Sequence, residues 1–458
     1  MNSFPADFLW GSATSSYQIE GATEVDGRGP SIWDTFARGE GNVIGGHTGD
    51  PACDHYHRYR EDVALLAELG LPAYRFSIAW PRVMPDGRRV EPRGLDFYDR
   101  LVDELVAHGI TPIPTLYHWD LPQALQDAGG WVNRDVPSWF ADYALVVGDR
   151  LGDRVRDWIT INEPLCSAFL GYGTGVHAPG LRDARQAVIA GHHHLLGHGL
   201  AATALRAHAR PDTKVAVALN FAPPLTDSDD AEHREAARRF DAVHNRFFLD
   251  PVLGRGYPPD LRADLAHLGA LESAIRDGDE EMIGRPLDWI GVNYYAPSRV
   301  IPTPDPLQES NCGLPGLRGV DVLPARGPLT TMDWEQDPVA FADLLLWLGE
   351  HCAPVPLIVT ENGSSFEDTV DADGRVRDTD RTHYLAEHLH AVHAAIAGGA
   401  DVRGYLAWSL LDNFEWSFGY TRRFGLVHVD FDTQRRRIKD SGRFYAEVVA
   451  ANAVPDRR

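Results

Sequence analysis

The sequence contains little cysteine and no long apolar run. Its four cysteines are far apart and include no C-x-x-C pair, so they indicate neither a zinc site nor a disulfide framework, and we expect free thiols. No uninterrupted apolar stretch approaches the ~18 residues of a membrane span. Residues 1–10 lack a basic segment followed by an apolar one. We therefore expect a soluble, cytoplasmic protein.

Basic residues are scarce relative to acidic ones. The chain has 66 Asp and Glu against 43 Lys and Arg, for a formal net charge of −23, and the acidic excess is spread along its length. This charge argues against nucleic acid and membrane partners and favours a neutral small-molecule substrate. The 458 residues, 44% of them hydrophobic, fit two or three ordinary domains or one barrel with long loops.

Short apolar runs alternate with longer amphipathic segments along the whole chain, which predicts βα units. Apolar residues Leu101, Val102 and Leu105 share one helical face before Gly109 ends the turn, for example. Because no composition break separates two halves, we predict one α/β domain over residues 1–458, a (β/α)₈ TIM barrel with extended βα loops at its C-terminal face. The expected strands are Leu9–Ser15, Ala73–Ile78, Thr111–His118, Asp157–Asn162, Lys214–Asn220, Asp288–Tyr294, Leu357–Thr360 and Gly404–Ser409.

Two long irregular stretches follow the sixth and seventh expected strands. Ile301–Thr331 has many Pro and Gly residues, and Ser364–Arg381 is rich in Asp and Arg. A two-domain interpretation would make the first a linker. We interpret it as a barrel loop, because the βα pattern resumes after it and such loops build active sites.

Two glutamates fit the chemistry of glycosidic bond cleavage, which needs one carboxyl group as proton donor and a second at the anomeric carbon. Glu163 comes two residues after the apolar run Trp158–Ile161, and Glu361 comes two residues after Leu357–Val359. In a closed barrel both would lie at the C-terminal rim, at the ends of strands four and seven. The alternative is that each glutamate merely caps a helix.

Five motifs in order resemble glycoside hydrolase family 1, the family of bacterial and plant β-glucosidases, over nearly the whole chain. They are Phe8–Gly21 (FLWGSATSSYQIEG), Tyr117–Pro122 (YHWDLP), Asn162–Pro164 (NEP), Thr360–Gly363 (TENG) and Trp408–Trp416 (WSLLDNFEW). The resemblance implies a retaining exo-β-glycosidase with Glu361 as nucleophile and Glu163 as general acid/base. It implies double displacement without a metal or organic cofactor.

The resemblance also assigns binding roles. Arg75 and Tyr295 would hold Glu361 ionised and oriented, and Trp408 would form a platform under the sugar. Asp333, in the loop that carries Trp334, stands where the family commonly has Gly. Cys166 and His177 would line the entrance or merely pack there. The residues expected to bind substrate are Gln18, His118, Trp119, Asn162, Tyr295, Trp334, Trp408, Glu415 and Trp416.

Glu415 bears on the substrate. The family's 6-phospho-β-glycosidases lack this acidic residue, and a carboxylate facing O4 and O6 would repel a 6-phosphate. We therefore expect an unphosphorylated β-glucoside. The alternatives are a 6-phospho-β-glucosidase and a non-catalytic sugar-binding protein on the same barrel. A role in cellulose degradation is expected because it is common in the family. The motifs do not rank glucose against galactose, fucose or xylose, and they do not give the aglycone or the oligomeric state.

Three further patterns have simpler interpretations. His192, His193, His194 and His198 lack the carboxylates or H-E-x-x-H spacing of a metal site, so we expect a helix-surface cluster. Asp371–Gly374 starts like a calcium loop but has no Glu at the twelfth place, which predicts a tight turn. The basic run Arg435–Arg437 is short and predicts a solvated turn.

Overall fold

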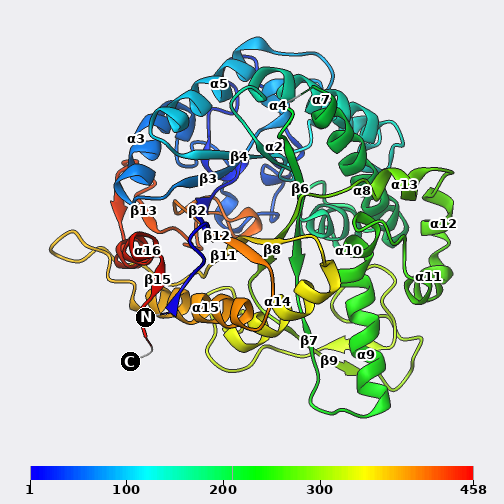
Figure 1. Ribbon diagram of the computed structural model, residues 1–458. Helices are drawn as coiled ribbons and strands as arrows, with labels where there is room; N and C mark the ends of the chain where they lie inside the picture. Colours follow the sequence, from blue (N-terminus) through cyan, green and yellow to red (C-terminus); the bar gives the residue numbers. More distant parts are fainter. Residues whose placement is uncertain (1, 209, 457–458) are drawn as a thin grey trace.

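The barrel predicted from the sequence is the centre of the structure, a computed structural model that describes residues 2–208 and 210–456. Eight parallel strands close in the order β2-β3-β4-β5-β6-β8-β11-β12 (Figure 1). All eight expected strands are confirmed to within a few residues. Their bounds are β2 Leu9–Ala13, β3 Ala73–Ser77, β4 Thr111–Tyr117, β5 Asp157–Asn162, β6 Lys214–Phe221, β8 Trp289–Tyr294, β11 Leu357–Asn362 and β12 Val402–Trp408.

The barrel strands are apolar almost throughout because parallel strands are buried on both faces. Side chains from seven of them pack together as one apolar cluster, as expected for a filled barrel interior. The cluster consists of Ala73, Ile113, Ile159, Ala216, Ala218, Trp289, Ile358 and Leu406.

Helices surround the barrel (Figure 1). Gly109, predicted to end a helix, follows α5 with a positive φ angle of 70°, and Gly70 follows α3 with one of 65°, a conformation that favours glycine. The longer helices are α3 His55–Glu68, α5 Pro92–Ala107, α7 Val136–Leu151, α8 Ala184–His208, α9 Ala231–Asp241, α14 Pro338–Cys352, α15 Thr379–Ala397 and α16 Asp440–Ala451. Shorter ones are α1 Ser16–Ile19, α2 Ile32–Ala37, α4 Trp80–Val83, α6 Gln123–Asp127, α10 Phe247–Val252, α11 Pro259–Leu265, α12 Ala270–Ala274, α13 Asp279–Ile283 and the π-helical η3 Cys166–Thr174 and η4 Ala242–Arg246.

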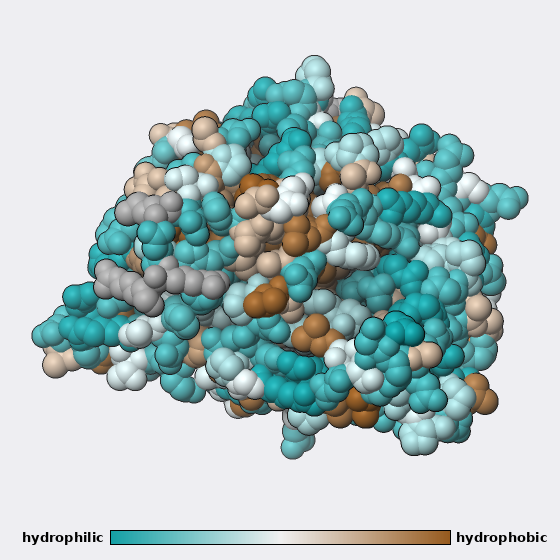
Figure 2. All heavy atoms as spheres, turned by 60° about the horizontal axis from the view of Figure 1, so that its bottom comes forward, coloured by the Kyte–Doolittle hydropathy of each residue, from teal (hydrophilic) through white to brown (hydrophobic). Residues whose placement is uncertain are grey.

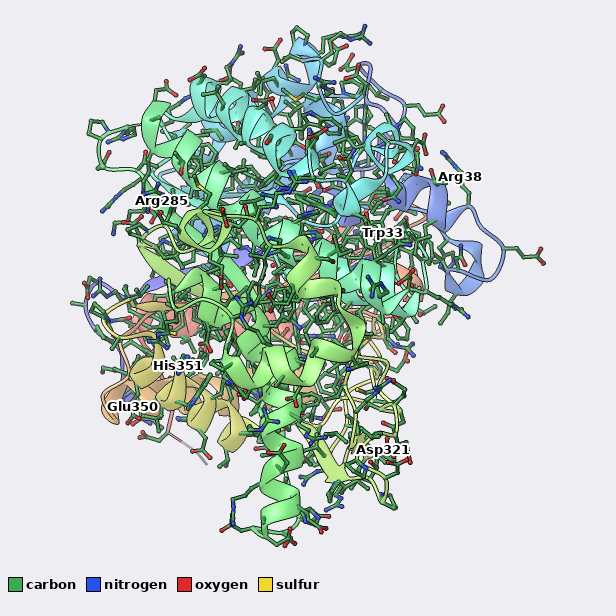
Figure 3. All side chains as sticks on the ribbon, turned by 90° about the vertical axis from the view of Figure 1, so that its right-hand side faces the viewer. Trp33, Arg38, Arg285, Asp321, Glu350 and His351 are labelled. Carbon is green, nitrogen blue, oxygen red and sulfur yellow. The ribbon has the colours of Figure 1, made fainter. Side chains whose placement is uncertain are left out.

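The long stretch after β8 is a barrel loop, as predicted, but it is not irregular throughout. Strand β9 (Ser298–Pro302) pairs with β10 (Val320–Val322) on one side and with β7 (Pro224–Leu225) on the other, in a small sheet. This sheet packs against α9, and Figure 3 shows Asp321 of β10 beside that helix. The sequence pattern missed the sheet because its strands are short and one comes from the loop after β6.

The ends of the described chain meet. β1 (Asn2–Ser3) pairs with β15 (Ala453–Val454), and a hairpin of β13 (Val427–Val429) and β14 (Arg436–Ile438) precedes α16. On the face turned forward in Figure 2, apolar side chains gather in the middle and hydrophilic ones cover the periphery. Within the described residues, no helix combines the length and apolar character that a membrane crossing requires.

The prediction of a surface histidine cluster is wrong. His192, His193, His194 and His198 are buried where α8 packs against α7 and η3. The ring of His194 pairs with the Ala190 carbonyl at 2.6 Å and the Ser167 hydroxyl at 3.0 Å. Burial lowers the pKa of His193 to about 4 and those of His194 and His198 to about 3. A consecutive histidine run gave no local sign of burial, because helices pack on α8 from several sides.

These neutral histidines should make folding sensitive to acid. Below pH ~6.5 these histidines take up protons in the unfolded chain but stay neutral in the folded chain. Their contribution to the free energy of unfolding is therefore fully present above that pH and is lost as the pH falls toward ~4. Each histidine should contribute a slope of up to ~1.4 kcal/mol per pH unit. Urea unfolding across this range measures it. His198→Gln should flatten the slope, whereas the exposed control His267→Gln should not; equal slopes would contradict the assignment.

Of the two turns predicted from the sequence, the first is confirmed and the second is wrong in part. Asp371–Gly374 is a tight turn, since the Gly374 N–H donates to the Asp371 carbonyl. The solvated turn predicted for Arg435–Arg437 is wrong for Arg436, whose buried guanidinium Nε lies 2.9 Å from Asp62 Oδ1. Residue 62 is too distant in sequence for this ion pair to be anticipated.

Candidate active site

A cavity of about 410 Å³ opens at the C-terminal ends of the barrel strands. Arg75, Asn162 and Gln18, also predicted to belong to the site, are not among its lining residues and lie behind them. The predicted residues that line the cavity are His118, Trp119, Glu163, Tyr295, Trp334, Glu361, Trp408, Glu415 and Trp416.

Glu361, the penultimate residue of β11, is held by a cation and a phenol. Arg75 Nη1 on β3 lies 2.5 Å from Oε1, and the Tyr295 hydroxyl donates to Oε2 at 2.7 Å. Burial, with the nearby Glu361 charge, raises the pKa of Tyr295 well above its usual value, so its hydroxyl stays protonated as a donor. Both oxygens are therefore oriented by groups that favour the carboxylate.

Glu163, directly after β5, lies in a different environment. Among the described residues it has no ion-pair partner; Asn293 Nδ2 donates to its Oε1 at 2.8 Å, and the buried Cys166 lines the cavity beside it. Burial, followed by the charge of Glu361, raises the pKa of Glu163 to about 8. Glu163 is therefore protonated at neutral pH.

Asn162 connects the two glutamates. Its Oδ1 accepts from Arg75 Nη2 at 2.6 Å and from Asn293 Nδ2 at 3.0 Å. With that oxygen so engaged, Nδ2 is the donor toward His118 Nε2, 3.2 Å away. Burial, with the charge of Arg75, lowers the pKa of His118, so its ring is neutral. Asn293 was not anticipated, although it is the penultimate residue of β8, two positions before the predicted Tyr295.

Gln18 supports the segment of Glu415 instead of facing the cavity. Its Nε2 lies 2.9 Å from the Phe414 carbonyl and 3.3 Å from Glu415 Oε2, and its Oε1 accepts from Ser15 at 2.6 Å. Burial, with the charge of Glu361, raises the pKa of Glu415 to about 8. This corrects the charge argument from the sequence, because a largely protonated Glu415 repels a phosphate only weakly.

Aromatic rings form one wall of the cavity. The His118 ring stacks 5.9 Å from both Trp408 and Trp416, measured between centroids. Trp416 also meets Trp119 at 4.5 Å and the buried Trp33, labelled in Figure 3, at 4.6 Å. Flat apolar faces beside hydrogen-bonding groups suit the two kinds of surface that a sugar ring presents.

The backbone at the cavity is unusual. Trp119, Glu163 and Trp416 have positive φ angles of 77°, 44° and 46°, which cost free energy for residues other than glycine and cluster at functional sites. Gly363 is required by close packing, since a Cβ there would lie 1.8 Å from the Trp408 carbonyl oxygen. The tight approach of β11 to β12 thus explains the glycine of the TENG motif.

Comparison with known proteins agrees with this geometry. Residues 1–454 match the profile of the family described as Glycosyl hydrolase family 1. The chain is 49% identical to the thermostable beta-glucosidase B of Thermobispora bispora, over 99% of this chain and 92% of that one. The chain belongs to glycosyl hydrolase family 1.

Solved structures of the family superpose on this chain. The psychrophilic beta-glucosidase of Micrococcus antarcticus is 48% identical, with a TM-score of 0.94 and 98% of each chain covered. The beta-glucosidase of Thermotoga maritima in complex with deoxynojirimycin is 42% identical, with a TM-score of 0.93, covering 99% of this chain and 100% of that one.

The departure from the family pattern at Asp333 leaves the loop conformation intact. Asp333 adopts a positive φ of 59°, the conformation that a glycine at this place favours and that Asp tolerates better than most residues. The next residue, Trp334, therefore reaches the cavity wall, with its ring 5.1 Å from that of Tyr295.

The entrance of this family 1 site has further residues that the motifs did not indicate. Cys166 and His177 do line it. Of the described residues, no group of three or more His, Cys, Asp or Glu is arranged to hold a metal ion, and the four cysteines are free thiols as predicted. The unanticipated lining side chains include Leu170, Asn220, Phe221, His244, Met332, Phe418 and Phe424.

Proposed function

We propose that this protein is a retaining exo-acting β-glucosidase. It would release terminal, non-reducing β-D-glucosyl residues from short oligosaccharides or from aryl and alkyl glycosides. The observation that carries the proposal is the contrast between two glutamates on one cavity. Glu361 is bound by Arg75 and Tyr295, whereas Glu163 has no ion-pair partner in the part of the chain that the structure describes and has a pKa of about 8. Two carboxyl groups in such different environments take different roles, one as an ionised carboxylate and the other as a protonated acid.

Double displacement follows from this contrast. The Glu361 carboxylate attacks the anomeric carbon while Glu163 donates its proton to the departing oxygen. Glu163, now ionised, takes a proton from water, which releases the sugar from Glu361 with retained configuration. Arg75 and Tyr295 keep the nucleophile oriented, and Asn162 couples their position to that of Asn293, which holds Glu163.

The sugar end of the cavity supports exo action. His118, Trp408, Glu415 and Trp416 are all buried and form a wall beyond the two catalytic glutamates. A terminal sugar fits against a closed wall, whereas the middle of a chain does not. In this proposal Trp408 stacks on the sugar face, His118 binds a sugar hydroxyl while Asn162 holds its ring from behind, and Glu415 and Trp416 bind O4 and O6. A cytoplasmic location and a role in cellulose degradation stay predictions.

An unphosphorylated sugar is favoured by the cavity lining. Among the described residues that line it there is no lysine or arginine. Arg75, behind the lining, is hydrogen-bonded to Glu361 and Asn162. A 6-phosphate would be placed next to Glu415 without a cation. An unpaired buried charge costs ~3 kcal/mol or more, equivalent to a factor of about 10² in rate.

The test is turnover of nitrophenyl glycosides. We expect release of nitrophenol from the β-glucoside and a kcat/KM at least about 10²-fold lower for the 6-phospho-β-glucoside. Parallel assays with β-galactoside, β-fucoside and β-xyloside rank the sugars. Faster turnover of the phosphorylated substrate would reassign the enzyme as a 6-phospho-β-glucosidase. No turnover of any of them would favour a non-catalytic sugar-binding protein.

A further inference from the structure

A buried cluster of six charges lies behind the catalytic cavity and contributes no residue to its lining. We refer to it as the charge cluster. Three carboxylates face three cations, so the formal charges balance, and only Arg423 is appreciably exposed, with 23% of its side chain accessible. Its members are Asp368, Asp378, Asp412, Arg381, Arg423 and Lys439.

Lys439 joins separate segments, as Arg381 of α15 also does through Asp368 and the Arg423 carbonyl. Its Nζ lies 2.5 Å from Asp368 Oδ2 and 2.6 Å from Asp412 Oδ1, and its side chain is fully buried. Asp368 belongs to the segment that follows β11, and β11 is the strand that carries Glu361. Asp412 belongs to the segment after β12, which carries Glu415 and Trp416. Lys439 itself precedes α16, so one ammonium connects three stretches of chain.

Asp412 transmits this connection to the sugar-binding segment. Besides Lys439, its carboxylate accepts from Arg423 Nη1 at 2.7 Å and from the Gly425 N–H at 2.9 Å. Glu415 follows three residues later. On the opposite side Gln18 binds the Phe414 carbonyl at 2.9 Å. Residues 412–416 are therefore held between Gln18 and the charge cluster, with only a short span free to adjust.

The composition of the chain singles out this lysine. Of 43 basic residues only Lys214 and Lys439 are lysines, and all the others are arginines. A compact ammonium can lie between two closely spaced carboxylates, whereas the planar guanidinium of arginine is larger and requires a different geometry. In a chain with only one other lysine, a fully buried lysine indicates a site that favours the smaller cation.

We propose that Lys439 is a positioning residue for sugar recognition, which holds Asp412 and thereby sets where Glu415 and Trp416 meet the O4 and O6 edge of the sugar. The inference rests on the proposed function. Without the ammonium, Asp368 and Asp412 face each other as buried carboxylates with a cation missing between them. They repel or take up protons, and residues 412–416 shift. Glu361, held by Arg75 and Tyr295, keeps its place.

The test compares a substrate that has the C6 hydroxyl with one that lacks it. In Lys439→Met, the ratio of kcat/KM for nitrophenyl β-glucoside to that for nitrophenyl β-xyloside should fall about tenfold, as expected from loss of a charge-assisted hydrogen bond. Much of the loss should be in KM for the glucoside. Lys214→Met, at the only other lysine and at the opposite end of the barrel, should keep the ratio of the unaltered enzyme.

A second variant covers the case in which Lys439→Met does not fold. Arg423→Met removes the partly exposed cation and leaves Asp412 paired with Lys439, so it should fold and lower the ratio by a smaller factor. Equal losses on both sugars, or an unchanged ratio in a folded variant, would show a purely structural role and overturn the inference. Absence of turnover in the unaltered protein would instead overturn the proposed function.

Discussion

Replacement of Glu361 by alanine should reduce turnover of nitrophenyl β-glucoside on the order of 10⁴-fold or more while the fold stays intact. The loss is large because no other carboxylate can reach the anomeric carbon in the same orientation. Glu361 is held on both oxygens, by Arg75 at 2.5 Å and Tyr295 at 2.7 Å. Nitrophenol release measures the loss, and circular dichroism checks the fold.

Glu367→Ala provides the matched control, because Glu367 is an exposed glutamate on the same segment after β11. It should retain normal turnover. Added azide should restore activity to Glu361→Ala by attacking from the vacated side, and the product should be the α-glycosyl azide because only one displacement occurs. A β-glycosyl azide, or full activity without azide, would exclude Glu361 as nucleophile.

Replacement of Glu163 by glutamine should lower kcat by about 10²- to 10⁴-fold, the usual contribution of a general acid/base. The decrease in the rate of the first step should be smallest for substrates with good leaving groups, because such groups depart without a proton. A comparison of dinitrophenyl with alkyl β-glucosides measures this difference. Similar losses for both leaving groups would contradict the role of Glu163 as acid.

The same variant should change the pH profile. Glu163 must be protonated to act as acid, and its pKa is raised to about 8, so kcat/KM should be complete below that pH and fall as pH rises through it. Glu163→Gln should lose this alkaline limb. Glu415, whose pKa is also about 8, is the necessary control, and Glu415→Gln should keep the limb. The opposite pattern would assign the limb to Glu415.

The sequence predicted the barrel well because each βα unit is a local pattern. Strand β11, for example, begins as the apolar run Leu357–Val359 and ends within the TENG motif at Asn362, so Glu361 lies at the end of the strand. Glu163 follows β5 in the same way. Since all barrel strands are parallel, residues at their C-terminal ends share one rim wherever they occur in the chain. This rule placed both glutamates on one cavity without knowledge of any contact.

The sequence by itself therefore determined the barrel, its family and the two glutamates at its rim. Tertiary structure alone decided that Asn293 holds Glu163, that Gln18 supports residues 412–416, that the α8 histidines are buried, and that Lys439 joins Asp368 to Asp412. These arrangements depend on partners tens to hundreds of residues apart. Local patterns reveal which face of a strand or helix is apolar, but burial and pKa depend on everything that packs around a group, and that is set only when the chain closes.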